Sequence, residues 1–222
     1  MLLRGVASAR CAELSPWLRL LMLAWVALGA AGASASAHWA TVQHLPSLVP
    51  LRDDLLKLLG RGSQMDMHLM HGVCIGGTVA VWLASLATAP SIERALMQWM
   101  LAYGACLLVR TVCVRVTLLP DPSGPERHVS KNALMAAMTH PSATQHDMLP
   151  SGHMLVVGVT AMLAPLARAH WALTAAWVAA SAWLTLVSRS HYTCDVVIGI
   201  VVGALMGNAA RSAAFADLPC VD

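Results

Sequence analysis

Apolar residues occur in long runs along the chain, and polar residues gather in short segments between them. A helix needs roughly 20 mostly apolar residues to cross the hydrocarbon core of a bilayer. Six stretches approach or meet this requirement, at about 17–37, 67–88, 95–118, 152–167, 171–187 and 194–214. The pattern predicts an all-α polytopic membrane protein, built as a six-helix transmembrane bundle.

The first of these stretches admits two interpretations. Arg4, Arg10 and Arg19 lie before or within its start, and it ends in Ala-Ser-Ala at Ala37, which fits a cleaved signal peptide as well as a first span. Either way, residues 38–66 are expected on the exoplasmic side, and the loops alternate from there. We therefore divide the chain into an N-terminal segment with the first span, a core that holds the other spans and a short cytoplasmic tail, at 1–48, 49–214 and 215–222.

Basic residues do not decide the orientation of the bundle. Cytoplasmic loops usually carry an excess of arginine and lysine, but here six fall on each side of the predicted membrane. The orientation rests on the N-terminal arginines instead. It places the longest polar segment, within residues 119–151, on the exoplasmic side, and a loop of that length is more often functional than idle.

Composition narrows the class of protein further. Charged residues make up 11% of the chain and the mean hydropathy is +0.65, whereas about 25% of residues are charged in ordinary soluble domains. The net charge of +3 is spread without a run of like charges, which argues against nucleic acid as a partner. The six cysteines form no CxxC pair, so we predict no disulfide framework, no metal site and no cofactor.

Two polar clusters stand where exoplasmic loops enter apolar helices. One is PSGH at 150–153 and the other is HYTCD at 191–195. One descending span, a turn and one ascending span separate His153 from His191, so we expect both imidazoles at one membrane face. His191 and Asp195 have the i,i+4 spacing that puts two side chains on one face of a helix.

These residue types suit chemistry at a phosphate group. A carboxylate at Asp195 can accept the Nδ1 proton of His191, which leaves Nε2 free as a nucleophile or base. Ser151 is a natural N-cap, Gly152 lets a ligand approach the backbone, and the amides of a helix N-terminus favour a phosphate oxygen. We predict His153, His191 and Asp195 as the catalytic residues.

Other ionisable residues are less easily interpreted. Arg110 lies too deep in the third span to reach the interface easily, and charges inside a bilayer are usually functional, so a structural role and a phosphate-binding role both stay open. Arg115 is near enough to the exoplasmic end to reach the interface. The His68/His71 pair lacks a nearby carboxylate or cysteine and is not predicted to bind a metal. We interpret the histidines outside the two clusters as ordinary polar residues: His38, His44, His68, His71, His128, His140 and His170.

The motifs resemble those of the phosphatidic-acid-phosphatase-like (PAP2) superfamily, and within it the sphingomyelin synthase-related branch. Asp147 followed by Ser-Gly-His at 151–153 is similar to that branch's Asp-x3-Ser-Gly-His block, and the segment 191–196 is similar to its last block, His-Tyr-Thr-x-Asp-Val. Arg110 with Thr117 is similar to an Arg-x6-Thr element of the branch. The resemblance implies that the six-helix bundle is of the PAP2-like type.

A fourth block and several departures refine this resemblance, which covers about residues 49–200. VPLRD at 49–53 is similar to the Pro-Pro-Leu-Pro-Asp block but matches it only in part. Two departures are Gln145-His146 in place of Cys-Gly and Ile200 in place of an aromatic residue. Arg189 adds a weaker resemblance to plant-type phosphatidylcholine:diacylglycerol cholinephosphotransferases. Candidate contacts of the substrate phosphate are Ser151, Gly152, Arg110, Arg189 and Asp147.

The resemblance implies a lipid headgroup transferase that uses a phosphohistidine intermediate on His191, with His153 as acid and then base. The partners would be a phospholipid donor, a lipid alcohol acceptor and the bilayer, and a homo-oligomer is compatible with the chain. The alternative is a lipid phosphate phosphatase, which Pro150 favours and the lack of a Lys-x6-Arg-Pro element disfavours. A non-catalytic lipid-binding relative would be expected to lack at least one catalytic residue. The expected location is an endomembrane of the Golgi or ER, or the plasma membrane, with the site on the exoplasmic or luminal face.

Overall fold

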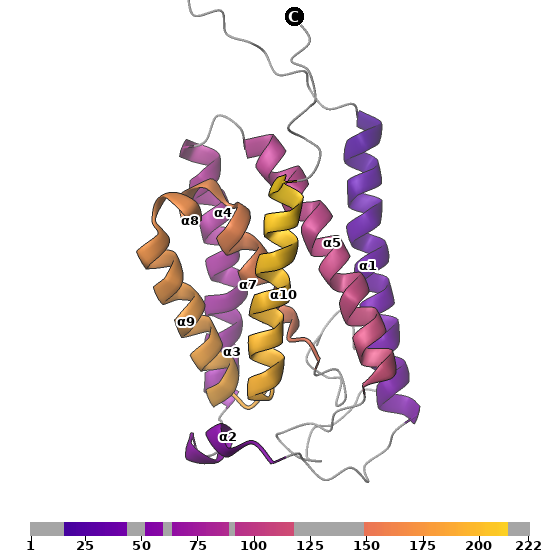
Figure 1. The fold of residues 1–222 in the computed structure, drawn as a ribbon, viewed down its shortest axis with the longest axis vertical. Helices are drawn as coiled ribbons and strands as arrows, with labels where there is room; N and C mark the ends of the chain where they lie inside the picture. Colours follow the sequence, from indigo (N-terminus) through magenta and orange to yellow (C-terminus); the bar gives the residue numbers. More distant parts are fainter. Residues whose placement is uncertain (1–15, 44–51, 60–63, 89–91, 118–148, 213–222) are drawn as a thin grey trace, which may run out of the picture.

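The computed structural model describes residues 16–43, 52–59, 64–88, 92–117 and 149–212, and Figure 1 shows the helices that these ranges form. No strand occurs among them, so the all-α prediction is confirmed for this part of the chain. In chain order the elements are α1 (Pro16–Gln43), α2 (Asp54–Leu58), α3 (Gln64–His71), a π-helical turn η1 (Gly72–Gly76), α4 (Gly77–Thr88), α5 (Ile92–Val116), α7 (Gly152–Leu163), α8 (Pro165–Ala169), α9 (Trp171–Val187) and α10 (Thr193–Ser212).

Four helical stretches in the described ranges are long and apolar enough to cross a membrane. They are Arg19–Ser36, Met67–Ala87, Arg94–Val116 and Thr193–Ser212. The helices Gly152–Leu163 and Trp171–Val187 are also apolar but shorter. The chain therefore has the helices of a membrane protein, while the predicted count of six spans is not confirmed.

The predicted span 152–167 is interrupted near its end. Helix α7 stops at Leu163, Ala164 adopts an extended conformation, and Pro165 begins α8. Proline disfavours the helical conformation in the residue before it and has no N–H group to continue the hydrogen-bond ladder. At 1.5 Å per residue, α7 is about 18 Å long, which is shorter than the hydrocarbon core of about 30 Å.

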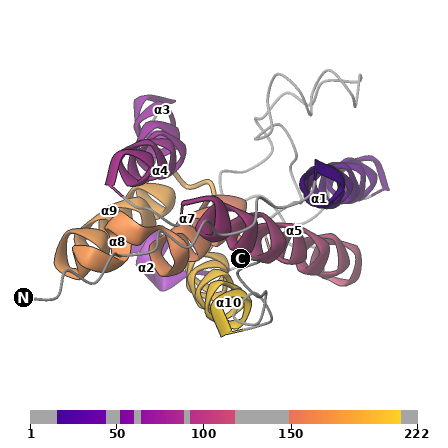
Figure 2. The same cartoon turned by 90° about the horizontal axis from the view of Figure 1, so that it is seen from above.

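Helix α7 occupies the centre of the bundle. Seen from above in Figure 2, it lies among α5, α9 and α10, while α1 packs at the edge against α5. Every residue of α7 from Met154 to Thr160 is buried, as is Leu163. A helix that is apolar all round in this way belongs to a core, so protein surrounds the helix that begins with PSGH.

Glycines let α7 and α10 approach each other closely. A Cβ atom on Gly203 would lie 2.6 Å from the carbonyl oxygen of Leu155, and one on Gly158 would lie 2.9 Å from a backbone oxygen of α10. Gly199 and Gly207 also face α7, so a glycine recurs every four residues along α10. Small residues at this spacing let helix backbones pack at short range in membranes. The contact fixes how the N-termini of the two helices lie relative to each other.

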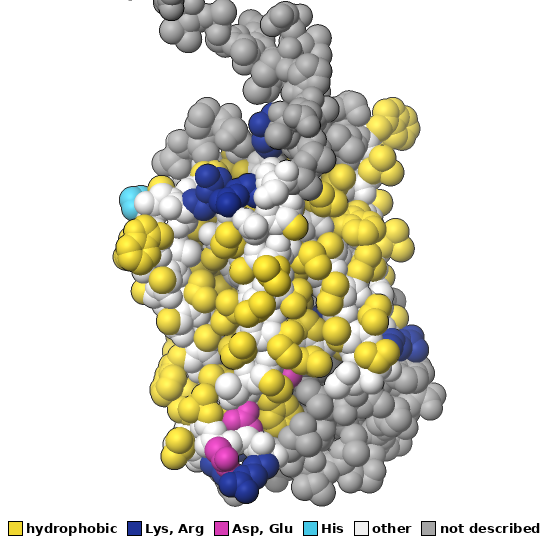
Figure 3. Space-filling model, in the orientation of Figure 1, with side chains coloured by type: hydrophobic (Ala, Val, Ile, Leu, Met, Phe, Trp, Pro, Cys, Tyr) yellow, Lys and Arg dark blue, Asp and Glu magenta, His cyan; other side chains and the backbone are white. Residues whose placement is uncertain are grey.

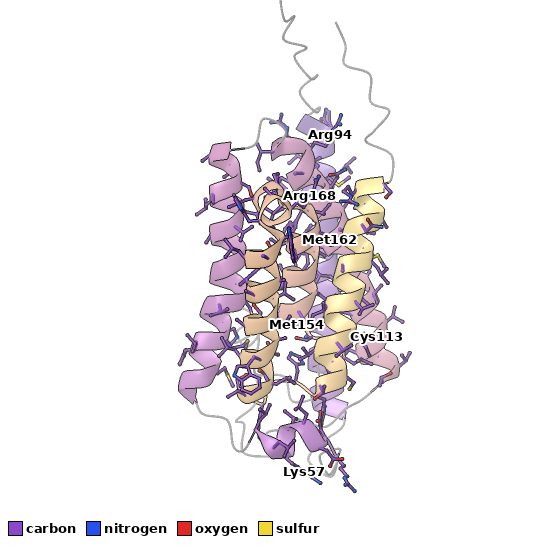
Figure 4. All side chains as sticks on the ribbon, turned by 60° about the vertical axis from the view of Figure 1, so that its left-hand side comes forward. Lys57, Arg94, Cys113, Met154, Met162 and Arg168 are labelled. Atoms are coloured by element: carbon purple, nitrogen blue, oxygen red, sulfur yellow. The ribbon has the colours of Figure 1, made fainter. Side chains whose placement is uncertain are left out.

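The outer surface is apolar between two charged ends. Figure 3 shows a broad band of hydrophobic side chains, with basic side chains at one end and both acidic and basic side chains at the other. Large apolar side chains such as Leu83 and Leu205 are more than half exposed. Figure 4 places Arg94 and Arg168 at the end opposite Lys57. This distribution suits a surface that contacts lipid acyl chains.

Candidate active site

The PSGH and HYTCD segments lie next to each other at the end of the bundle that carries α2 (Figure 1). The backbone N–H of Ser151 donates a hydrogen bond of 3.2 Å to the carbonyl oxygen of Asp195. The ring centroids of His153 and His191 are 6.4 Å apart. Two histidines from separate helix starts therefore reach one small volume.

His191 and Asp195 form a buried pair, with 5% and 0% of their surface exposed. Nδ1 of His191 lies 3.8 Å from Oδ2 of Asp195, which is longer than a hydrogen bond. The same oxygen accepts the backbone N–H of Tyr192 at 3.0 Å. His191 precedes α10, which begins at Thr193. The two residues are therefore brought together by the turn into the helix, and not by one helix face as the spacing predicted.

Arg110 reaches the PSGH segment from α5. Its Nη1 atom donates a hydrogen bond of 3.1 Å to the carbonyl oxygen of Pro150, and its guanidinium occupies the space where a Cβ atom on Gly152 would lie. The absence of a side chain at Gly152 thus makes room for the arginine, whereas the sequence pattern suggested room for a ligand. The result is a positive charge beside the first turn of α7, one residue from His153.

Ser151 caps α7, as its residue type predicted. Its hydroxyl oxygen accepts the backbone N–H of Met154 at 3.5 Å, and its side chain is fully buried. The first backbone N–H groups of a helix have no acceptor within the helix itself. Those of α7 are therefore suited to a phosphate oxygen, while the Ser151 hydroxyl is engaged in capping.

The short helix α2 holds the start of α10 through Asp53. Oδ2 of Asp53 accepts the backbone N–H of Thr193 at 2.8 Å, and Oδ1 accepts the Thr193 hydroxyl at 3.1 Å. The same carboxylate caps α2 by accepting the N–H groups of Leu55 and Leu56. Burial by itself raises the pKa of Asp53, but the hydrogen bonds from Thr193, Leu56 and Leu55 together lower it below its ordinary value. Asp53, the last residue of the VPLRD segment, thus supports the loop that carries His191.

Arg189 and Asp147 were both predicted to contact the substrate phosphate. The Nη2 atom of Arg189 donates a 2.7 Å hydrogen bond to the carbonyl oxygen of Leu56, so this side chain binds α2. Arg189 also has a positive φ of 51°, which turns the chain between α9 and α10. Asp147 lies outside the described residues. A phosphate contact stays a prediction for both.

His71 lies at the site although the sequence pattern suggested an ordinary polar residue. Its ring centroid is 4.8 Å from that of His153, in an edge-to-face arrangement. It is the last residue of α3, and the π-helical turn η1 follows it directly; such turns occur frequently at functional sites. The one available signal was its place at the start of the second apolar run, and its partner in the i,i+3 pair, His68, is exposed.

The polar groups of this cluster are the imidazoles of His71, His153 and His191 and the guanidinium of Arg110. Among the residues that the structure describes, no three His, Cys, Asp or Glu side chains are grouped so that they could hold a metal ion. Imidazoles can gain or lose a proton near neutral pH. Two of them with ring centroids 6.4 Å apart, one backed by a carboxylate, can supply a nucleophile and a proton donor to the same group.

Comparison with known proteins bears on the last third of the chain. Residues 146–211 match the family described as PAP2 superfamily C-terminal. The PAP2 match supports that superfamily, whose members are phosphoryl-transfer enzymes, and with it a function of the lipid phosphatase or phosphotransferase type. A search of the curated proteins gives no match. The PAP2 segment contains both motifs, whereas Asp53, His71 and Arg110 lie outside it.

Proposed function

We propose that the protein transfers a phosphate-linked headgroup, such as phosphocholine, from a glycerophospholipid to ceramide or diacylglycerol through a phosphohistidine intermediate. The observation that carries this proposal is the pair of imidazoles of His153 and His191, with centroids 6.4 Å apart and the buried Asp195 carboxylate beside His191. The PAP2 match supports phosphoryl transfer in general.

In the first half-reaction, Nε2 of His191 attacks the phosphorus atom of the donor lipid. Asp195 faces Nδ1 and favours the tautomer in which that nitrogen carries the proton, so the lone pair of Nε2 is available. As the nitrogen–phosphorus bond forms, the bond from phosphorus to the diacylglycerol oxygen breaks. His153 gives its proton to that oxygen, diacylglycerol leaves, and the headgroup stays on His191.

In the second half-reaction, His153 is neutral and accepts the proton of the acceptor hydroxyl. The hydroxyl oxygen then attacks phosphorus and displaces Nε2 of His191, which returns both histidines to their starting states. Arg110 and the first backbone N–H groups of α7 provide positive charge for the phosphate oxygens. Their contribution is largest in the transition state, where negative charge on those oxygens develops.

The position of the site at one end of an apolar bundle supports a lipid substrate. The site lies at the end of the bundle that carries the charged helix α2, and the face in Figure 3 is apolar between that end and the other. A phospholipid can therefore present its phosphate to the histidines while its acyl chains stay in the bilayer. In this proposal residues 49–214 form the catalytic core, and the site faces the exoplasmic or luminal side of an endomembrane or the plasma membrane.

The second candidate is a lipid phosphate phosphatase, in which water attacks the phosphohistidine. The PAP2 match supports it equally, and Pro150 completes the sequence PSGH that is typical of the phosphatases. Because both reactions share the first half-reaction, only the identity of the second attacking group distinguishes them.

The test is a transfer assay with the purified protein in vesicles of phosphatidylcholine that contain fluorescent ceramide or diacylglycerol. We expect a fluorescent phospholipid to form in proportion to the donor, and we expect His191→Ala to abolish its formation. Release of phosphocholine or phosphate without fluorescent phospholipid would show that the protein is a hydrolase and not a transferase. Full activity of His191→Ala would exclude the proposed mechanism.

The pH profile gives an independent check of the nucleophile. A protonated imidazole has no lone pair on Nε2, so a histidine nucleophile should make the activity fall on the acid side. Initial rates at a saturating donor concentration between pH 8 and pH 4 measure this. A flat profile over that range would contradict the assignment of His191.

A further inference from the structure

We propose that His71 is a positioning residue for His153, which holds the His153 ring in place and provides its hydrogen-bond partner when His153 carries the proton. This inference rests on the proposed function, because there His153 is the group that donates and accepts the proton. It adds a third imidazole from a helix outside the segment that matches the PAP2 family.

The ring of His153 has two histidine neighbours at different distances. The centroids of His71 and His153 are 4.8 Å apart, and those of His153 and His191 are 6.4 Å apart. Two imidazoles that share a hydrogen bond of about 3 Å have centroids roughly 5 Å apart, because each nitrogen lies about 1 Å from its ring centre. At the shorter separation the two rings are in direct edge-to-face contact, and the longer one suits a substrate group between acid and nucleophile.

The tautomer of His71 determines what this residue can offer. Its Nδ1 atom lies 2.9 Å from the carbonyl oxygen of Met67, and because a carbonyl oxygen only accepts, Nδ1 carries a proton. In the neutral ring Nε2 then has a lone pair and can accept a hydrogen bond. His153 benefits from such an acceptor because the guanidinium of Arg110, which packs on the neighbouring Gly152, opposes a second positive charge.

A neutral acceptor also suits the two roles of His153 better than a carboxylate. His153 must hold a proton in the first half-reaction and release it to the leaving oxygen. A carboxylate would stabilise the imidazolium strongly and slow that release, whereas a neutral imidazole orients the ring at a smaller electrostatic cost. His191, which acts as a nucleophile, has the carboxylate of Asp195 instead.

The surroundings of His71 anchor its backbone to α9. The indole N–H of Trp177 donates a 2.9 Å hydrogen bond to the carbonyl oxygen of Val73 in η1. Cys74, also in η1, is fully buried, and its sulfur lies 3.9 Å from the Thr185 hydroxyl oxygen. The π-helical turn is thus fixed across the bundle, and a ring held in this way can fix the orientation of its neighbour.

The kinetic test compares three variants in the transfer assay. His71→Leu removes the acceptor and should lower kcat on the order of 10- to 100-fold, as losses of a partner behind a functional histidine do, while KM for the donor changes little because the donor itself is not contacted. His71→Gln keeps an amide oxygen and should recover most of the rate. His68→Leu, at an exposed position of the same helix, should behave as wild type.

An NMR measurement tests the role of His71 without any catalytic turnover. In protein labelled with 15N-histidine in detergent, with resonances assigned through His153→Gln, His71→Leu should shift the ring resonances of His153 and their titration, and His68→Leu should not. Unmoved His153 resonances, a wild-type kcat in His71→Leu, or a raised KM with unchanged kcat would each overturn the role of His71. If the wild-type protein neither transfers nor hydrolyses a headgroup, the proposed function fails, and the resonances still decide whether His71 is the partner of His153.

Discussion

At the scale of single residues, Asp53 joins two parts of the site through one carboxylate. It caps α2 and at the same time accepts two hydrogen bonds from Thr193 at the start of α10. Arg189 strengthens the same contact through its bond to the carbonyl oxygen of Leu56. Because His191 lies between Arg189 and Thr193 in the chain, these contacts fix both sides of the loop that carries it.

Replacing Asp53 tests this role. Asp53→Ala should destabilise the protein by about 0.5–2 kcal/mol through the lost cap alone, and it should lower transfer activity further because the His191 loop is released. Thermal unfolding in detergent and the transfer assay measure the two effects. Asp54→Ala is the matched control, since Asp54 forms exposed ion pairs with Arg52 and Lys57, which contribute little. Equal effects of the two substitutions would contradict the role of Asp53.

The pH dependence of stability follows from the lowered pKa of Asp53. A carboxyl group whose pKa is lower in the folded state stabilises the fold above its unfolded value, ordinarily 3.8, and this stabilisation is lost as the pH falls through the folded value. Wild type should therefore be more stable than Asp53→Asn at pH 7 and at pH 5, and the difference should shrink below about pH 4. Unfolding midpoints of both proteins across this range measure it, and a difference that grows as the pH falls below 4 would disagree.

The effects of substitutions at Gly152 and Arg110 on activity should depend on each other. A methyl group at position 152 would collide with the end of the flexible Arg110 side chain, which can move away without disturbing the helices. Gly152→Ala should therefore keep nearly wild-type stability and lose at least about tenfold in activity, because charge stabilisation of the phosphate is lost. The double variant with Arg110→Ala should be little worse than either single variant. Additive losses would show that the two residues act separately.

At the scale of elements, the contact between α7 and α10 sets the geometry of the site. The glycines at 158, 199, 203 and 207 remove side chains from this contact, and the backbone bond from Ser151 to Asp195 lies at its end. Each helix carries one of the two histidine motifs at or just before its start. The distance between the helices therefore determines the distance between the two histidines.

Gly203→Val should separate these helices. The added Cβ would meet a backbone oxygen at 2.6 Å, and backbone cannot move aside as a side chain can, so we expect a loss at or above the upper end of the usual 1–3 kcal/mol for overpacking, about 3 kcal/mol. Activity should fall as well, because His153 and His191 move apart. Ala209→Val places the same side chain at an exposed position of α10 and serves as the control. Wild-type unfolding and activity in Gly203→Val would contradict the close contact.

At the scale of the whole molecule, the two ends of the bundle carry different residues. The candidate site and α2 lie at one end, and Arg94 and Arg168 lie at the other (Figure 4). Between them the surface is apolar (Figure 3). If the bundle crosses a membrane, the site and these arginines face opposite compartments.

Labelling from one side of the membrane tests this arrangement. In a variant whose native cysteines are replaced by alanine, we expect Lys57→Cys to react with a membrane-impermeant maleimide added to the exoplasmic side. Arg168→Cys should react only after the membrane is permeabilised. Reversed labelling would invert the orientation that the N-terminal arginines predict, and labelling of both positions from one side would contradict a bundle with its two ends in different compartments.

Much of the fold and part of the site could be predicted from local patterns. Apolar runs indicate helices because burial in lipid requires them, and the start of α7 is marked by Ser151. The break at Pro165 was also present in the sequence, but hydropathy alone does not register it. Pairings across the bundle could not be predicted, because the side chain that faces His153 from α3 depends on how helices far apart in the chain pack.

The sequence by itself determined the helical class of the protein and the identity of the two motifs, since both depend on residues close together in the chain. The tertiary structure alone decided that Arg110 fills the space beside Gly152, that Asp53 holds the start of α10, and that His71 contacts His153. Each of these contacts joins residues at least 40 positions apart, with 82 positions between His71 and His153. Only the close packing of the helices, through glycines and a π-helical turn, brings such side chains within reach.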